Sequence, residues 1–173
     1  MKPQIEKIIS GNREVLKFIG LLLFFTIIFH FIYQSFIIGK EQILRETTAL
    51  IVGFFLNLIG IHNSVDGVDI IFGSVAAFNI IYGCIGIYPI MVFAACVLAY
   101  PATIKSKIIG IVPGILILYA IEIVRLTFLG IINIHYHGLF DVTHVYFWQA
   151  TLIIFVLLLL FLWITRIVEK ENR

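Results

Sequence analysis

Long apolar runs with almost no charge constrain this sequence more than any other feature. Residues 18–38 and 145–165 are each 21 residues long and contain no Lys, Arg, Asp or Glu. About 20 apolar residues in a helix cross the roughly 30 Å hydrocarbon core of a bilayer. Residues 85–100 and 106–126 are nearly as apolar, and the mean hydropathy of the chain is +1.10. The sequence therefore predicts one integral membrane domain over residues 1–173, an all-α polytopic transmembrane helical bundle with four spans.

Basic residues gather at three points and predict how these spans are oriented. They precede the first span, separate the second from the third, and follow the fourth, as Lys2, Lys7, Arg13 and Lys17, then Lys105 and Lys107, then Arg166, Lys170 and Arg173. Loops rich in Lys and Arg stay in the cytoplasm. The loops 62–69 and 133–144 carry aspartates and no basic residue, so we expect them on the outer side. No small-residue cleavage site follows the first span, so we expect it to be retained rather than cleaved as a signal peptide.

Residues 39–83 connect two spans whose facing ends both lie on the predicted outer side. This segment must therefore cross the membrane twice or not at all. Residues 45–61 are apolar but short for a span, and residues 65–83 carry two aspartates and the alternating β-branched pattern of strands. We predict a short or re-entrant helix followed by a small extracytoplasmic hairpin.

Charge and cysteine content exclude several classes of function. The net charge is +2 and the basic residues are spaced as membrane anchors, so the lipid bilayer is an expected partner and nucleic acid is not. Cys84 and Cys96 form neither a disulfide framework nor a metal-type spacing. Cys96 lies mid-span among apolar residues, where most thiols are inert. His135 and His137 have no Cys or carboxylate arranged with them, so they are loop polarity or reserve general bases rather than metal ligands. We predict no metal and no cofactor.

Three polar residues on different spans are predicted to lie at one depth. Cys84 lies 21 residues before Lys105, Arg125 lies 18 after Lys107, and His144 lies 22 before Arg166. At 1.5 Å per residue these separations are roughly 27 to 33 Å along a helix, about one hydrocarbon thickness. The three side chains are therefore candidates for a single site at the outer rim of the membrane.

Each of these residues also has an ordinary interpretation. Arg125 would reach lipid headgroups or pair with Glu122 one helical turn earlier. Cys84 would be a small apolar residue, and His144 would be an interfacial side chain beside Tyr146. The conjunction of the three at one depth favours a shared site.

The three residue types together suit nucleophilic catalysis. An imidazole or a cation lowers the pKa of a nearby thiol and populates the thiolate, which is the nucleophile. The guanidinium of Arg125 would hold a carbonyl or carboxylate and stabilise an oxyanion. Gly83 and Gly86 would let a substrate backbone approach closely, or would serve as turn or packing positions.

The stretch YGCIGIYPIMVFAACVLAYPATIKSKIIGIVPGILILYAIEIVRLTFL, followed by FDVTHVYFWQATLIIF, resembles the exosortase/archaeosortase family of membrane transpeptidases. The resemblance covers about residues 45–165 and is closest to the short exosortase H-like members. Its marks are the Cys-Gly turn, the arginine late in the next span and the histidine opening the last one. The family usually has Asn three residues before its arginine and a small polar residue after its cysteine, where this chain has Glu122 and Ile85.

The resemblance implies a membrane-embedded cysteine transpeptidase or protease in the bacterial cytoplasmic (inner) membrane, with its active site on the extracytoplasmic side. Cys84 would be the nucleophile, His144 the acid/base and Arg125 the electrostatic partner, with Gly83, Gly86 and Glu122 as substrate-binding candidates. Substrates would be secreted proteins that end in a short motif, a transmembrane helix and a basic tail. The alternative is a non-catalytic membrane assembly or signal-binding subunit.

Overall fold

A computed structural model describes residues 13–37, 39–73, 76–81, 83, 85–135 and 148–171 of the protein. In chain order the elements are α2 (Arg13–Ile32), the π-helical turn η1 (Tyr33–Ile37), α3 (Gln42–Leu58), β1 (Ser64–Asp66), β2 (Asp69–Phe72), β3 (Ala76–Asn79), α4 (Ile87–Ala99), α5 (Ile104–His135), α7 (Trp148–Trp163), the π-helical turn η5 (Ile164–Val168) and α8 (Glu169–Glu171).

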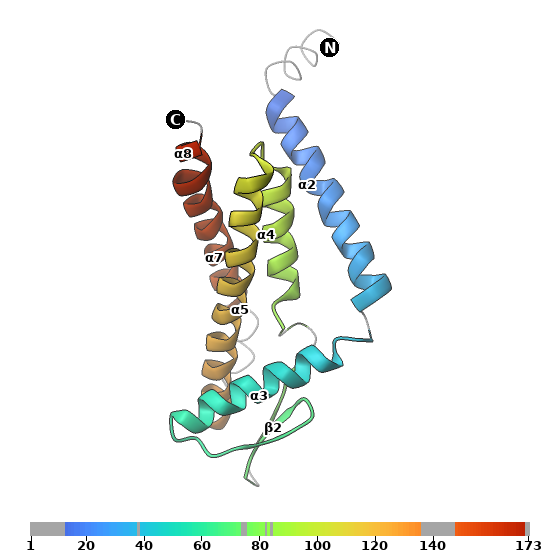
Figure 1. The fold of residues 1–173 in the computed structure, drawn as a ribbon. Coiled ribbons are helices and arrows are strands. Elements are labelled where there is room, and N and C mark those ends of the chain that lie inside the picture. Colours follow the sequence, from blue (N-terminus) through green and yellow to red (C-terminus); the bar gives the residue numbers. More distant parts are fainter. Residues whose placement is uncertain are drawn as a thin grey trace, which may run out of the picture.

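Four helices, α2, α4, α5 and α7, run alongside one another, and α3 lies across one end of them (Figure 1). Helix α4 contacts each of the other three. The small sheet lies beyond α3, on the side away from the described termini, which both lie at the opposite end of the bundle. We call these two ends the sheet end (α3 and β1 to β3) and the basic end. The segment between α2 and α4 starts and finishes at the sheet end. This agrees with the expectation that residues 39–83 cross the membrane twice or not at all.

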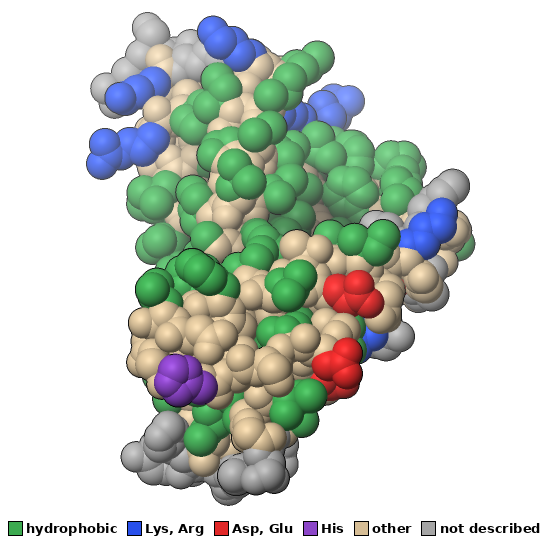
Figure 2. All heavy atoms as spheres, turned by 60° about the horizontal axis from the view of Figure 1, so that its bottom comes forward, with side chains coloured by type: hydrophobic (Ala, Val, Ile, Leu, Met, Phe, Trp, Pro, Cys, Tyr) green, Lys and Arg blue, Asp and Glu red, His purple; other side chains and the backbone are tan. Residues whose placement is uncertain are grey.

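The charged side chains follow this division. The basic end holds Arg13, Lys17, Lys105, Lys107, Arg166 and Lys170, because these residues begin α2, begin α5 and follow α7. Figure 2 shows most Lys and Arg side chains gathered there, with Asp, Glu and His side chains towards the sheet end and hydrophobic side chains between. Lys40 and Arg45 follow α2 and lie at the sheet end. Which end faces the cytoplasm stays a prediction.

Three helical segments in the described part of the chain are long and apolar enough to cross a membrane: Arg13–Ser35, Ile104–Ile134 and Gln149–Val168. The fourth predicted span, residues 85–100, is the 13-residue helix α4, about 20 Å long. It is short because it begins after the left-handed Gly86 and ends at Tyr100, just before Pro101. The finding is thus three long spans and one shorter apolar helix in place of four equivalent spans.

Helix α5 is longer than predicted. It continues through Pro113 and nine residues past position 126, to His135, so its 32 residues measure about 48 Å. A proline in a membrane helix is tolerated where neighbouring groups satisfy the freed backbone carbonyl. Asn133 and Ile134, which the sequence placed in an outer loop, are therefore helical, and Arg125 lies well inside the helix.

The segment that was hardest to predict forms an amphipathic helix and a sheet. Helix α3 buries one face, made of Arg45, Thr48, Ala49, Val52, Gly53 and Leu56. The three strands form one antiparallel sheet in the order β1-β2-β3, with Val65 opposite Ile70 and Ile70 opposite Phe78. Strand structure is thus confirmed here, with three strands instead of a hairpin. The side of the membrane on which the sheet lies stays a prediction.

Two hydrophobic cores fill the two ends. The sheet-end core joins α3, the sheet, Ile85 and the second half of α5, and its fully buried members include Val52, Leu56, Ile70 and Leu126. The basic-end core joins α4, the first half of α5 and α7 through Phe93, Val97, Leu118, Val156 and Trp163.

Candidate functional site

The structure describes four of the six predicted site residues. Arg125 and Glu122 lie on α5, Gly83 precedes α4, and Gly86 caps it. The proposed nucleophile Cys84 and the proposed acid/base His144 lie outside the described residues, as do His137 and Tyr146. Their grouping with Arg125 therefore stays a prediction.

Glu122 and Arg125 form a buried ion pair within α5. Arg125 Nη1 donates to Glu122 Oε1 over 2.6 Å, one helical turn apart. The side chain of Glu122 has no exposed surface and that of Arg125 is 7% exposed. Of the two ordinary interpretations of Arg125, the structure confirms pairing with Glu122 and excludes exposure to headgroups.

This pair is incompletely satisfied in the described part of the chain. Glu122 Oε2 and Arg125 Nε are both buried and meet no described hydrogen-bond partner. A buried charge pair loses its hydration, and its mutual attraction compensates only when further hydrogen bonds satisfy the remaining atoms. The arrangement therefore leaves one carboxylate oxygen and one guanidinium N–H able to take part in further polar contacts.

The surroundings of the ion pair are buried, while its depth in the membrane stays a prediction. Because α5 runs on to His135, α3 and β3 pack over its second half. Leu126 and Leu129, next to the pair in sequence, are fully buried in the sheet-end core. The guanidinium is thus enclosed by protein, and charge–charge interactions are stronger there than at a hydrated rim.

Gly86 lies directly against Glu122. Its φ is 70°, a left-handed conformation that favours glycine. A Cβ added at this position would lie 3.3 Å from Glu122 Cγ. Ile85 is buried in the core that also contains Ile123 and Leu126. The two residues that follow Cys84 are therefore held against the part of α5 that carries the ion pair.

Gly83 lies before α4, which begins at Ile87. A Cβ at Gly83 would meet no heavy atom within 4 Å, so the described surroundings do not require a glycine there. Its role as a substrate-binding residue stays a prediction.

Arg45 is a buried polar residue that the sequence reasoning did not single out. It is 8% exposed, and its Nε donates to the carbonyl of Ile80 over 2.6 Å. It begins the short apolar run 45–61. An ionisable residue in a membrane-associated helix is a functional candidate by default, and that rule would have found it.

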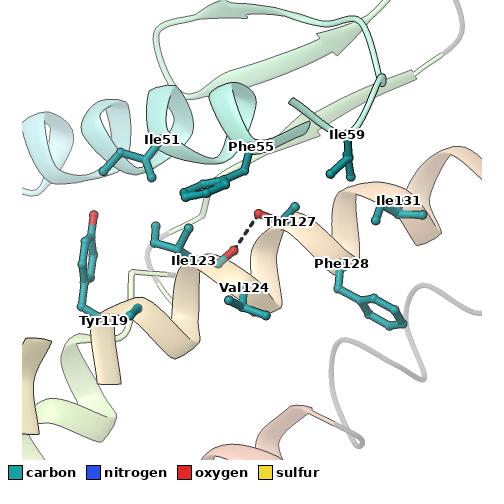
Figure 3. Close-up of a pocket in the computed structure, with 10 residues that line it drawn as sticks. Ile51, Phe55, Ile59, Tyr119, Ile123, Val124, Thr127, Phe128 and Ile131 are labelled. Atoms are coloured by element: carbon teal, nitrogen blue, oxygen red, sulfur yellow. Dashed lines mark hydrogen bonds between the residues drawn. The ribbon is translucent and has the colours of Figure 1, made fainter. Parts of the chain in front are cut away.

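An apolar groove of the described structure lies elsewhere. It has a volume of about 490 Å³ and runs between α3 and α5, lined by Ile51, Phe55, Ile59, Tyr119, Ala120, Ile123, Val124, Thr127, Phe128 and Ile131 (Figure 3). Successive residues of a helix are rotated by about 100°, so positions 120, 124, 127 and 131 lie on the side of α5 opposite Glu122 and Arg125. The groove opens away from the ion pair.

Metal-binding groups are not gathered in the described residues, where no three His, Cys, Asp or Glu side chains lie close enough to hold an ion. Cys96 is a free, partly buried thiol in the last turn of α4.

Comparison with protein families gives a match over most of the chain. Residues 9–165 match the family described as transmembrane exosortase. The chain belongs to this family. The match covers nearly the whole sequence, including α2, α3 and the sheet, and so extends beyond the region 45–165 on which the resemblance was based. No curated protein and no solved structure gives a match.

Proposed function

We propose that this exosortase is a membrane-embedded cysteine transpeptidase or protease that cleaves the C-terminal sorting signals of secreted proteins. Cys84 is the nucleophile, His144 the acid/base and Arg125 the electrostatic partner. The site faces the outer side of a bacterial cytoplasmic membrane. The substrates are secreted proteins that carry a short motif, a transmembrane helix and a basic tail.

One observation supports this proposal above the others. In a chain that belongs to the family, the left-handed Gly86, two residues after Cys84, packs against Glu122, which holds Arg125 at 2.6 Å. A buried guanidinium beside the segment that carries the thiol is suited to stabilise negative charge on a reacting carbonyl oxygen, because water does not screen it.

The proposed reaction has two steps. The Cys84 thiolate attacks the scissile carbonyl carbon, the C–N bond breaks, and the leaving amine takes a proton from His144. The product is a thioester between Cys84 and the substrate. An acceptor amine, or water, then attacks the thioester carbonyl, gives its proton to His144, and releases Cys84 as the thiolate.

The test is substitution of each cysteine in cells that express a tailed substrate. Cys84→Ala is expected to abolish cleavage, whereas the matched variant Cys96→Ala removes the other thiol and is expected to cleave normally. Arg125→Lys is expected to lower the cleavage rate by about a hundredfold, because Lys keeps the charge but not the planar fork. Normal cleavage by Cys84→Ala would exclude the proposed enzyme.

A non-catalytic subunit that binds sorting signals is the second candidate, and one observation favours it. Glu122 occupies the place of the family's usual Asn, and its carboxylate offsets the charge of Arg125 in a direct ion pair. If this candidate is correct, Cys84→Ala and Cys96→Ala both leave the substrate uncleaved as the parent does, while the tailed substrate still co-purifies with the protein.

A further inference from the structure

Arg45 holds the backbone just before the segment that carries Cys84. Its Nε donates to the Ile80 carbonyl over 2.6 Å, and its Nη2 lies 3.4 Å from Asn79 Oδ1. The Ile80 amide in turn donates to the carbonyl of Val68 over 3.0 Å. The backbone at residues 79–80 is thereby tied to α3 on one side and to the sheet on the other.

Asn79 connects this arginine to a carboxylate. Asn79 Nδ2 donates to Asp69 Oδ1 over 2.6 Å, while Asn79 Oδ1 faces Arg45. Asp69 and Asn79 are also directly opposite each other in the β2–β3 pair. The relay Arg45–Asn79–Asp69 gives the buried guanidinium an anionic partner through an amide, which offsets part of its desolvation cost.

The two ends of the segment 80–86 are held by two buried charged side chains. Ile80 is bonded to Arg45 on α3, and Gly86 packs against Glu122 on α5. The two helices meet directly at this level. Thr48, three residues after Arg45, shares a 3.1 Å hydrogen bond with the hydroxyl of Tyr119, three residues before Glu122. Cys84 lies within this seven-residue segment.

The structure assigns to Arg45 the role of a positioning residue for the nucleophile, an inference that rests on the proposed function. The described hydrogen bonds of Arg45 go to Ile80 and Asn79. Arg45 fixes the chain at Ile80, and Glu122 fixes it at Gly86, and these are the two ends of the segment whose sequence includes Cys84. The planar guanidinium is required because one side chain must donate hydrogen bonds to a backbone carbonyl and to a side-chain amide oxygen at the same time.

The test compares Arg45→Met with the parent in a Cys96→Ala background. Two rates are measured per folded molecule: cleavage of a tailed substrate, and alkylation of Cys84 by a small maleimide in the purified full-length protein. Arg45→Met is expected to lower cleavage by about a hundredfold, since a small misplacement of a reacting group has that effect, and to change the alkylation rate several-fold. Arg45→Lys is expected to bring the cleavage rate and the alkylation rate only part of the way back to the parental values.

Lys107 provides the matched control. Its Nζ donates to the Leu98 carbonyl over 2.6 Å, at the other end of α4, so it makes the same kind of contact far from Cys84. Lys107→Met is expected to lower the unfolding temperature and to leave both rates per folded molecule unchanged.

The outcomes separate this inference from the proposed function. Loss of cleavage in Cys84→Ala together with parental rates in Arg45→Met overturns the role of Arg45 alone. Cleavage by Cys84→Ala overturns the proposed function itself. If Arg45→Met does not fold, Asn79→Ala breaks the Arg45–Asn79–Asp69 relay by a substitution at an exposed residue. It is then expected to lower cleavage several-fold, and unchanged rates in that variant also overturn the inference.

Discussion

The sheet end and the basic end of this molecule bury different chemistry. In the described residues the buried polar and charged side chains are Glu41, Arg45, Thr48, Ser106, Glu122 and Arg125. All but Ser106 lie on α5 past Tyr119 or between α2 and the middle of α3, and hence towards the sheet end. At the basic end, Trp163 Nε1 donates to the Ser106 carbonyl over 2.8 Å, Lys107 Nζ donates to the Leu98 carbonyl, and aromatic rings pack on glycines.

This difference agrees with a proposed site at the sheet end and a stabilising role for the basic end. At the basic end Phe93 packs on Gly114 and Trp163 on Gly110, so closely that an added Cβ would overlap the rings. Such packing is favourable in a membrane, where small residues let helices approach. At the sheet end the protein buries charges at a free-energy cost. A protein that keeps such a buried charge in spite of its cost has a use for a preorganised charge. The buried charges of the sheet end therefore agree with the proposed site.

The largest expected effect comes from breaking the buried ion pair. Glu122→Gln leaves the guanidinium of Arg125 buried without its counter-charge, and we expect the free energy of unfolding to fall by about 3–5 kcal/mol. The double variant Glu122→Gln/Arg125→Met is expected to regain most of this stability but not cleavage. Denaturant unfolding in detergent measures the first effect and substrate processing the second. A Glu122→Gln variant as stable as the parent would show that the pair is not buried as described.

The next effect concerns the two glycines beside Cys84. Gly86→Ala places a Cβ against Glu122 and imposes a left-handed backbone on alanine, so we expect a loss of about 1–3 kcal/mol in stability and reduced cleavage. Gly83→Ala is the matched variant and should leave the unfolding temperature unchanged, because nothing lies within 4 Å of its Cβ position. Equal unfolding temperatures for the two variants would contradict the assigned geometry of Gly86.

A smaller effect is expected from overpacking the basic end. Gly114→Val forces the ring of Phe93 to move and should cost about 1–3 kcal/mol of stability. Cleavage per folded molecule should stay at the parental level, because the site lies at the other end of the bundle. Thermal unfolding and processing assays on the same preparation check both statements. A drop in cleavage per folded molecule would mean that the two ends are coupled.

The smallest expected effects compare one hydrogen bond from each end. Thr48→Val removes the 3.1 Å contact with Tyr119, and Trp163→Phe removes the 2.8 Å bond to Ser106. Each should cost about 1 kcal/mol of stability. Only Thr48→Val is expected to slow cleavage, since it lies between Arg45 and Glu122. Equal cleavage by the two variants would weaken the link between α3 and the site.

The parts of this fold that depend on neighbouring residues could be predicted, and the parts that depend on contacts between distant residues could not. The apolar runs that became α2, α5 and α7 were evident because a membrane selects helices by local composition. The strands at residues 64–79 were also visible as local alternation. The shortness of α4 and the extension of α5 to His135 depend on what packs against their ends, and the sequence did not show this.

The candidate site divides in the same way. Spacing from basic anchors indicated that Arg125 belongs with the segment around Cys84, and Gly86 does lie against its partner Glu122. The partners of Arg45 could not be predicted, because Ile80 and Asn79 lie 35 and 34 residues along the chain. Pairings over such distances are chosen by the folded arrangement of α3 and the sheet.

By itself the sequence determined that this chain is a multi-pass membrane protein, while the shared depth of its thiol, guanidinium and imidazole stays a prediction. Only the tertiary structure decided that the guanidinium is enclosed with Glu122 and that Arg45 ties down the chain before Cys84. Spans follow from the transfer of local apolar surface into lipid, whereas burial of a charge depends on which distant groups fold over it.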